Sequence, residues 1–271
     1  MTGESFAISG AGPELYDRIG RTYTGTRRPD PRIATAIWDA LGDAATVLNV
    51  GAGAGAYEPP DREVVALEPS EVMITQRPPG AAPVVRGRAE KLPFEDDAFD
   101  AVMAVLSDHH WTDRRQGFAE LRRVARARVV LFNANPGEAD LFWLTTEYLP
   151  EFLDLIPARY RRPGTWEREF EAGLGRQFDQ VPVPIAHDCS DGFYGAFWRR
   201  PDAYLDPDVR AGISVFAQVP SAAANRAIDA LTADLETGRW RQRHRALLDL
   251  SELHLGYYVV VAELTQRNRR K

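Results

Sequence analysis

A glycine-rich run directly after an apolar segment is the first candidate for chemistry. The run 51–56 alternates glycine with alanine and follows the segment Val47–Val50, which is apolar except for Asn49. Glycine has no Cβ, so the backbone there can take positive φ angles and approach a ligand closely. At the carboxyl end of a strand such a loop opens the crevice where α/β sheets bind ligands, and its amides can hold an anion. The run therefore predicts a binding loop for a carboxylate or a phosphate.

Glu68 is the acidic partner of this loop. It lies 17 residues after Gly51, at the end of the next apolar segment, and its carboxylate can accept hydrogen bonds from both hydroxyls of a ribose. The pattern also satisfies the dinucleotide form G-x-G-x-x-A with an acid nearby, and a glycine-rich turn without a ligand is the simplest alternative. Pro59 and Pro60 leave room for little more than one helical turn before Val64. A dinucleotide fold needs a full helix there, so a smaller anion is favoured.

A histidine pair, His109 and His110, follows the fourth apolar segment in the run 107–111. This position is at the carboxyl edge of the expected sheet and faces the same crevice. An imidazole is poised near neutral pH, so either histidine is a candidate general base. In the alternative, one histidine caps the helix that begins near Thr112 and the other packs under Trp111.

Aromatic side chains become frequent after Pro136 and could wall an apolar ligand pocket. We expect substrate contacts from Trp111, Trp143, Phe193, Tyr194 and Trp198. Ordinary core packing is the alternative for each of them. The dipeptide 187–188 could supply a second base, but its place at the end of a proline-broken strand favours a structural role, and no neighbour activates Cys189.

Short apolar segments alternate with helical ones between residues 31 and 136. Helices are expected from Pro31 to Leu41 and over Thr112–Arg126, where apolar residues recur at helical spacing. Valine-rich strands, apolar on both faces, are expected at Thr46–Val50, Val64–Leu67, Val84–Val85, Ala101–Leu106 and Val129–Phe132. This alternation predicts an α/β fold with a doubly wound, mostly parallel sheet.

The C-terminal half adds two more strands and a helical insertion. Val181–Ala186 contains two prolines, so it should lie at a sheet edge, and Tyr257–Leu264 is expected to be the last strand. Helices or helical turns are expected at Phe193–Trp198, Ala222–Leu235 and Arg243–Leu253. The expected organisation is an N-terminal helical segment over the site (1–43), the core (44–189), a helical cap inserted between the last two strands (190–255), and a final core strand with a basic tail (256–271).

Together with residues 87–102, these features resemble the class I S-adenosylmethionine-dependent methyltransferases, in particular their type 11 branch. That family carries Gly-x-Gly-x-Gly after its first strand, an acid after its second, and then approximately Asp-Ala-x-x-Leu-Pro-Phe, as in the run 88–94 here. A Phe-Asp pair follows before the fourth strand, as at Phe99-Asp100. The resemblance covers residues 14 to 136 and implies a Rossmann-like fold that binds S-adenosylmethionine.

The resemblance also implies roles for individual residues. The glycines would lie along the methionine portion of the cofactor, Glu68 would bind the ribose, and the dipeptide 89–90 would flank the adenine. Relatives carry a histidine followed by an aromatic residue at the position of His110, which favours it over His109 as the base. The cofactor contacts implied in this way are Tyr16, Tyr23, Arg27, Arg28, Asn49, Gly51, Ala52, Gly53, Gly55, Glu68, Pro69, Ala89, Glu90 and Leu106.

Two positions depart from the family pattern. Asn49 stands where most members carry an acid, and Arg88 stands where the family has its adenine-binding Asp. An asparagine can still hydrogen-bond the loop, whereas an arginine cannot accept a bond from an adenine amino group. Glu90 is then the acceptor for that amino group.

Composition excludes several classes of partner. The net charge of -6 argues against nucleic-acid binding, and the basic end 267–271 is expected to be a solvated tail. The single cysteine excludes an internal disulfide, and no Cys/His cluster suggests a metal site. No signal sequence or apolar run of membrane-spanning length is present, so a cytoplasmic protein without membrane contact is expected.

The function predicted is methyl transfer from S-adenosylmethionine to a small, partly apolar molecule such as a secondary metabolite. Because a fold does not fix its chemistry, two alternatives remain. One is a cyclase or lyase that retains the cofactor-binding scaffold. The other is a non-catalytic partner subunit that binds S-adenosylmethionine. A nicotinamide enzyme is disfavoured by the short first crossover.

Overall fold

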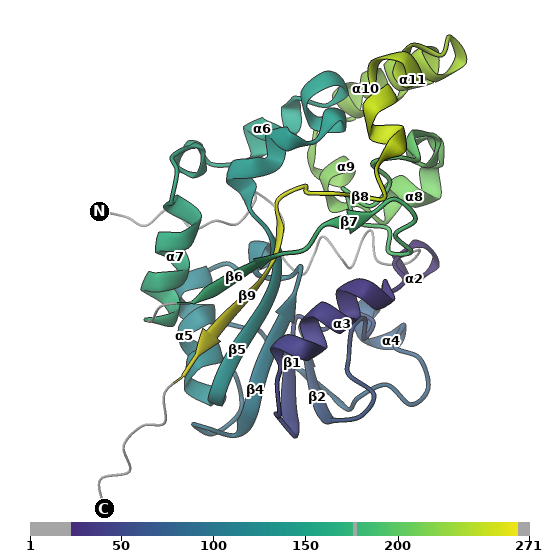
Figure 1. The fold of residues 1–271 in the computed structure, drawn as a ribbon. Helices are drawn as coiled ribbons and strands as arrows, with labels where there is room; N and C mark the ends of the chain where they lie inside the picture. Colours follow the sequence, from purple (N-terminus) through teal and green to yellow (C-terminus); the bar gives the residue numbers. More distant parts are fainter. Residues whose placement is uncertain (1–22, 176–177, 265–271) are drawn as a thin grey trace, which may run out of the picture.

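A seven-stranded sheet forms the centre of the protein (Figure 1). The structure is a computed structural model, and it describes residues 23–175 and 178–264. The strand order is β3-β2-β1-β4-β5-β9-β6; β9 is antiparallel to β5 and β6, and the other pairs are parallel. The strands are β1 (Thr46–Val50), β2 (Glu63–Glu68), β3 (Val84–Arg86), β4 (Phe99–Val105), β5 (Ala125–Ala134), β6 (Asp179–Pro182) and β9 (Tyr257–Glu263). The Rossmann-like, mostly parallel sheet expected from the sequence is confirmed.

Helices cover both faces of this sheet, which is why its strands are apolar on both sides. On β1, Val47 packs into the cluster that contains α3, while its neighbour Leu48 packs into the cluster that contains α5 and α7. The helices of these layers are α3 (Pro31–Ala40), α4 (Glu71–Thr75), α5 (Arg114–Val124) and α7 (Thr165–Leu174), and the short α2 (Tyr23–Thr26) precedes α3 away from the sheet (Figure 1).

Two of these helices begin at capping aspartates. Asp30 accepts a hydrogen bond from the backbone N of Arg32 (2.9 Å) at the start of α3. Asp113 accepts one from the N of Gln116 (2.9 Å) at the start of α5. These bonds satisfy amides that have no partner within a helix, which fixes where each helix begins. Neither histidine of the pair caps α5.

The prolines near residue 182 end the sheet at its edge, as the sequence predicts. The strand β6 pairs only with β9 and stops at Pro182, and the chain then forms a separate short ribbon of β7 (Ile185–Ala186) with β8 (Glu252–Leu253). The helix expected over Arg243–Leu253 is therefore wrong in its second half. The first half forms a 3-10 turn, η7 (Arg245–Asp249), whereas the second half forms β8, because the chain there pairs with β7.

Helices gather beyond the end of the sheet at which β9 begins (Figure 1). Between β7 and β8 lie η6 (Pro201–Leu205), α8 (Pro207–Ala211), α9 (Ser214–Gln218), α10 (Ser221–Glu236) and α11 (Arg239–Arg243). Between β5 and α7 lie η3 (Pro136–Leu141), the π-helix η4 (Leu144–Tyr148), α6 (Glu151–Leu155) and η5 (Ala158–Arg161).

The first of these two groups packs against the second. Tyr148 donates a hydrogen bond to Asp234 on α10 (2.8 Å). Trp143 Nε1 donates to the carbonyl of Trp198 (2.8 Å), and both rings are buried. Residues 142–155 thus join residues 190–255, and we call the two segments together the cap. Within the described part of the chain, no helix is both long and apolar enough to cross a lipid bilayer.

Candidate active site

The glycine-rich loop leaves the end of β1 with three positive φ angles. These are +70° at Gly51, +52° at Gly53 and +93° at Gly55. A Cβ on Gly51 would lie 2.6 Å from the Cβ of Ser107, so no other residue fits without displacing Ser107. The amides of Gly51 and Ala52 both donate to the carbonyl of Leu67, at 2.8 and 3.1 Å. The loop is thereby fixed against the ends of the neighbouring strands.

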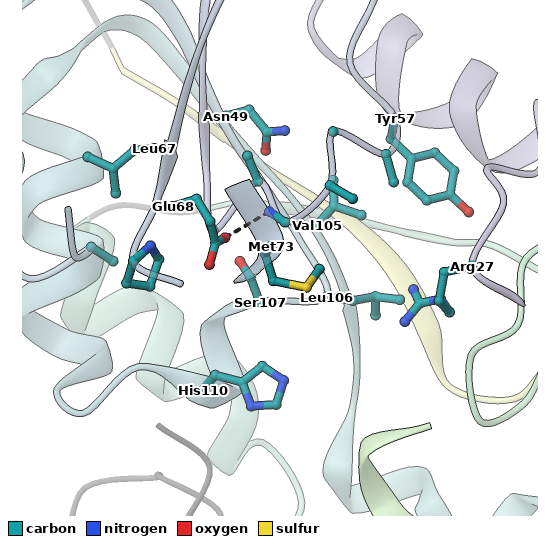
Figure 2. A pocket seen from close by; sticks show the side chains of 18 of the residues that line it. Arg27, Asn49, Tyr57, Leu67, Glu68, Met73, Val105, Leu106, Ser107 and His110 are labelled. Carbon is teal, nitrogen blue, oxygen red and sulfur yellow. Dashed lines mark hydrogen bonds between the residues drawn. The ribbon is translucent and has the colours of Figure 1, made fainter. Parts of the chain in front are cut away.

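Glu68 lies at the end of β2 with its carboxylate already oriented. Oε2 accepts a hydrogen bond from the N of Gly53 (2.8 Å), and Oε1 accepts one from the N of Ser70 (2.9 Å). Figure 2 shows this side chain directed into the space between the loop, Ser107 and His110. Each carboxylate oxygen has a second lone pair, so the group can also accept from two adjacent hydroxyls.

A cavity of about 410 Å³ opens beside this loop, and we call it the first cavity. Most of the expected cofactor contacts lie in its wall. Those that line it are Arg27, Asn49, Gly51, Ala52, Gly53, Gly55, Glu68, Pro69, Ala89, Glu90 and Leu106. Arg28 is exposed and lines neither this cavity nor the second one described below. Tyr16 and the side chain of Tyr23 lie outside what the structure describes.

Asn49 presents a buried acceptor to the first cavity. Its side chain is buried, and its Nδ2 donates to Oε1 of Glu58 (3.3 Å). Arg77 holds that glutamate through an ion pair of 2.7 Å. Among the described residues, Oδ1 of Asn49 has no hydrogen-bond partner. A buried acceptor without a partner is costly, so this atom is suited to receive an N–H donor from a ligand.

Glu90 is partly engaged by the protein itself. Its Oε1 accepts hydrogen bonds from the N and Oγ1 of Thr112 (2.6 and 2.7 Å) and from the N of Asp113 (3.2 Å). This ties the segment after β3 to the start of α5. The expected acceptor role toward an adenine amino group would fall to Oε2.

The two histidines stand between two cavities. They belong to the 3-10 turn η2 (Asp108–His110), and their rings lie 3.8 Å apart at a tilt of 49°. His110 lines the first cavity, and His109 lines a second cavity of about 150 Å³. Asp108 is not oriented toward either ring; it accepts from Nε and NH2 of Arg114 (3.0 and 2.5 Å).

The pKa of His109 differs from the sequence-based expectation of an imidazole that titrates near neutral pH. Burial, together with the positive charges of Arg114 and Arg27, lowers its pKa from 6.5 to about 3. The ring is therefore neutral at physiological pH and is a weak base. A neutral imidazole still offers one N–H donor and one nitrogen acceptor.

The second cavity adjoins the first at Arg27 and Leu106, which line both. Leu106 follows β4 and has a φ of +47°, a conformation that non-glycine residues rarely adopt and that often marks a functional site. Phe193 and Tyr194 lie in its wall as expected, joined by Phe142 and Tyr257. Sequence reasoning missed Tyr257. Because β9 is antiparallel, its first residue lies at the same edge as the carboxyl ends of β4 and β5.

The three tryptophans expected to contact the substrate do not lie together. Trp111 is buried, lines the first cavity and packs against Phe118. Trp143 and Trp198 are buried inside the cap and line neither of the two cavities described. Trp198 Nε1 donates to the carbonyl of Ile185 (2.9 Å), which anchors the cap to β7. We therefore propose a packing role for these last two rings instead of the expected substrate contact.

Arg27 is held by a buried carboxylate from the cap side of the molecule. Its Nε donates to Oδ1 of Asp191 (2.6 Å), and Tyr57 donates to Oδ2 of the same residue (2.8 Å). Asp191 is only 1% exposed. Asp191 thereby joins three parts of the chain. Arg27 lies after α2, Tyr57 directly follows the glycine-rich loop, and Asp191 itself lies where the chain enters the cap. Among the described residues no cluster of His, Cys, Asp or Glu could hold a metal ion.

Comparison with known proteins identifies the family of this chain. A profile described as "Methyltransferase domain" matches residues 48–132. A solved structure from Anabaena variabilis ATCC 29413, described as a methyltransferase from an antibiotic biosynthesis pathway, has a TM-score of 0.79 and 31% sequence identity. The match covers 90% of this chain and 100% of that chain.

Two other relatives are more distant. The uncharacterized methyltransferase YcgJ of Bacillus subtilis (strain 168) is 28% identical over 157 residues, which is 52% of this chain and 62% of that protein, so the match spans less than two thirds of its length. The [4+2]-cyclase SpnF has a TM-score of 0.52 at 13% identity, with 93% of this chain and 94% of that chain covered. At that identity the likeness to SpnF shows a shared fold only.

Proposed function

The chain belongs to the class I S-adenosylmethionine-dependent methyltransferases, and from this we propose that it transfers a methyl group to a small, partly apolar molecule held in the second cavity. The cofactor of the family is S-adenosylmethionine. When bound, it supplies an electrophilic methyl group carried on a sulfonium. The residues of this chain have to bind it, align an acceptor with it and keep water out.

The residues around the first cavity fit this cofactor. Glu68 offers an oriented carboxylate to the two ribose hydroxyls. Asn49 Oδ1, buried and without a partner among the described residues, suits an ammonium group. The close approach of the loop at Gly51 and Gly53 leaves room for the methionine chain, and the buried Ala89 is placed to flank the adenine. Arg27, in the wall of both cavities, is a candidate partner for the cofactor's carboxylate.

The observation that carries the proposal is the contact between the two cavities at Leu106 and Arg27. Two reactants held in adjoining cavities react as if they were one molecule, which can remove a large part of the barrier to a bimolecular displacement. His109 and His110 stand at the same boundary, one toward each cavity. We propose that His109 meets the acceptor and that His110 contacts the cofactor.

The division of the chain follows from this assignment. We propose that residues 44–189 contribute the cofactor-binding core, except for residues 142–155, which belong with residues 190–255 to the acceptor-binding cap. The hydrogen bonds of Tyr148 and Trp143 to the later cap helices support this division.

Calorimetry followed by a turnover assay tests the proposal. We expect S-adenosylmethionine and S-adenosylhomocysteine to bind and NAD not to bind. With a panel of small apolar acceptors, we expect S-adenosylhomocysteine to be formed in equal amount to the methylated product. Binding of the cofactor without methyl transfer to any acceptor would instead support a scaffold used for other chemistry, such as a cyclase or a partner subunit.

A further inference from the structure

The second cavity has the size of a single aromatic ring. Its volume is about 150 Å³, and an engineered apolar cavity of about 150 Å³ in a protein core is known to bind benzene. A fused polycyclic ring system would not fit entirely within this volume. The volume alone therefore limits the part of the acceptor that enters the cavity.

Several aromatic side chains line this cavity. Phe142 and Tyr194 meet edge to face with their ring centres 5.3 Å apart at 90°, and Phe193 lies 4.8 Å from Tyr257 at 56°. Phe142, Phe193, Tyr194 and Tyr257 all line the cavity. Ring edges and faces presented from several directions favour a flat aromatic ligand over a flexible aliphatic one.

Two polar groups in the wall have hydrogen-bonding capacity that the described residues do not use. No hydrogen bond joins the ring nitrogens of His109 to any described residue. The hydroxyl of Tyr257 accepts from the N of Gly195 (3.2 Å) but donates to no other described residue. The ring of His109 also packs against that of His110, which lines the first cavity, so it marks the side on which the two cavities meet.

The ionic groups of the cavity already have hydrogen-bond or ion-pair partners within the protein. Asp108 is paired with Arg114, and Arg27 is paired with Asp191. Glu138 accepts hydrogen bonds from Tyr258 (2.9 Å) and from Nδ2 of Asn135 (2.9 Å) and lies 3.0 Å from Nε2 of His254. A protonated amine would find no carboxylate that lacks a donor, and its desolvation would be poorly repaid. A neutral hydroxyl avoids this cost.

We propose that the acceptor is a neutral phenol with a single ring, whose ring lies among these aromatic side chains and whose hydroxyl meets His109 and Tyr257. This inference rests on the proposed function and names the class of its acceptor. In the overall reaction the phenolic oxygen gains the methyl group and loses its proton to solvent. The carbon–sulfur bond of the cofactor breaks with its electron pair kept by sulfur, giving S-adenosylhomocysteine and an aryl methyl ether.

Binding to the protein saturated with S-adenosylhomocysteine tests the acceptor class without turnover. The probes are phenol, toluene, benzylamine and 2-anthrol, measured by calorimetry or by ligand-observed NMR. We expect phenol to bind about tenfold more tightly than toluene, because one neutral hydrogen bond contributes about that factor. Benzylamine at pH 7 and 2-anthrol should bind more weakly than either.

Variants locate the binding in the second cavity. Tyr257→Phe keeps the ring, and His109→Phe fills the same place without hydrogen-bonding atoms; each should lower phenol affinity toward that of toluene and leave toluene affinity unchanged. Ala134→Leu, in the cavity wall, should weaken both ligands at least tenfold. The same substitution at Ala222, on the exposed side of α10, is the matched control and should change neither.

The outcomes separate this inference from the proposed function. If S-adenosylhomocysteine does not bind, the proposed function is overturned. If it binds but toluene equals phenol, or benzylamine or 2-anthrol is the best ligand, the acceptor class is wrong while the methyltransferase assignment stands. Methylation of phenol to anisole by the unmodified protein, reduced in Tyr257→Phe through the acceptor's KM, would support both.

Discussion

Glu68 is held by two backbone amides, from Gly53 and Ser70, before any ligand binds. A carboxylate fixed in this way loses little further freedom when it accepts bonds from a ribose. The arrangement also explains why the glycine loop and the acid occur together, since the amide of the loop is one of the two groups that orient the acid.

Replacing Glu68 by Ala should weaken S-adenosylmethionine binding by roughly 10- to 150-fold, because a hydrogen bond to a charged group contributes about 1.5–3 kcal/mol. Calorimetry gives the affinity directly. Glu71→Ala is the control: its carboxylate is exposed, and among the described residues it forms an ion pair with the exposed Arg86 alone. Equal affinities of the two variants would place the ribose elsewhere.

His109 should also make the stability of the protein depend on pH. Its pKa is lowered from 6.5 to about 3 by burial and by Arg114 and Arg27. Between these two values the unfolded chain binds the proton and the folded chain does not. Above pH 6.5 the ring is neutral in both states and does not lower the stability. As the pH falls from 6.5 toward 3, the unfolded chain gains a proton that the folded chain does not bind, so the free energy of unfolding decreases.

Urea unfolding at pH 7, 6 and 5 measures this contribution. The native chain should lose more free energy of unfolding than His109→Phe over this range, by at most about 1.4 kcal/mol per pH unit. Parallel curves for the two proteins would show that the imidazole titrates normally in the folded state.

At the scale of elements, the turn after β1 decides whether the cofactor loop can form. Gly51 and Gly80 both have positive φ angles, +70° and +85°. A Cβ on Gly51 would meet Ser107 at 2.6 Å, whereas a Cβ on Gly80 would meet nothing within 4 Å. An alanine at each position therefore separates two costs: the positive φ angle, which both share, and the steric contact with Ser107, which only Gly51 would make.

Gly51→Ala should therefore lower both stability and cofactor affinity, while Gly80→Ala should show only the backbone cost of about 1 kcal/mol. Denaturant unfolding and calorimetry on both variants measure these effects. If Gly51→Ala binds S-adenosylmethionine as tightly as the native chain, the contact with Ser107 does not set the shape of the loop.

At the scale of the whole molecule, Asp191 connects parts of the chain that are far apart in sequence. It joins Arg27 of the N-terminal region, 164 positions away, and Tyr57 of the glycine loop. Removing one partner of a buried ion pair leaves the other charge uncompensated, which costs more than the pair itself contributes.

Asp191→Ala should destabilise the protein by about 3 kcal/mol. The control is Asp188→Ala, three residues earlier, whose ion pair with Arg32 is exposed on both sides and should contribute less than about 1 kcal/mol. Thermal unfolding with and without S-adenosylmethionine compares them. A similar loss in both variants would argue against Asp191 as the connection between the cap and the loop.

The sequence by itself determined the core of the fold and most of the cofactor cavity. Valine-rich segments that are apolar on both sides can be satisfied only between two layers of helices, and Pro182 cannot continue a ladder of hydrogen bonds, so strands and edge were predictable. Glycines at 51 and 53 and an acid at 68 are local signals of a binding loop, and all three lie in the wall of the first cavity.

Only the tertiary structure decided which aromatic side chains face the second cavity. Phe142, Phe193 and Tyr257 come from three separate segments, and nothing in their local sequence distinguishes them from Trp143 and Trp198, which are buried in the cap. The end of the helix expected over Arg243–Leu253 gave way to β8 because a partner strand, β7, was available: Ala186 pairs with Glu252, which lies far from it in the sequence. Packing of distant segments selects among side chains of equal apolarity, and it also sets the charges around His109 that lower its pKa. Local propensity contains neither kind of information.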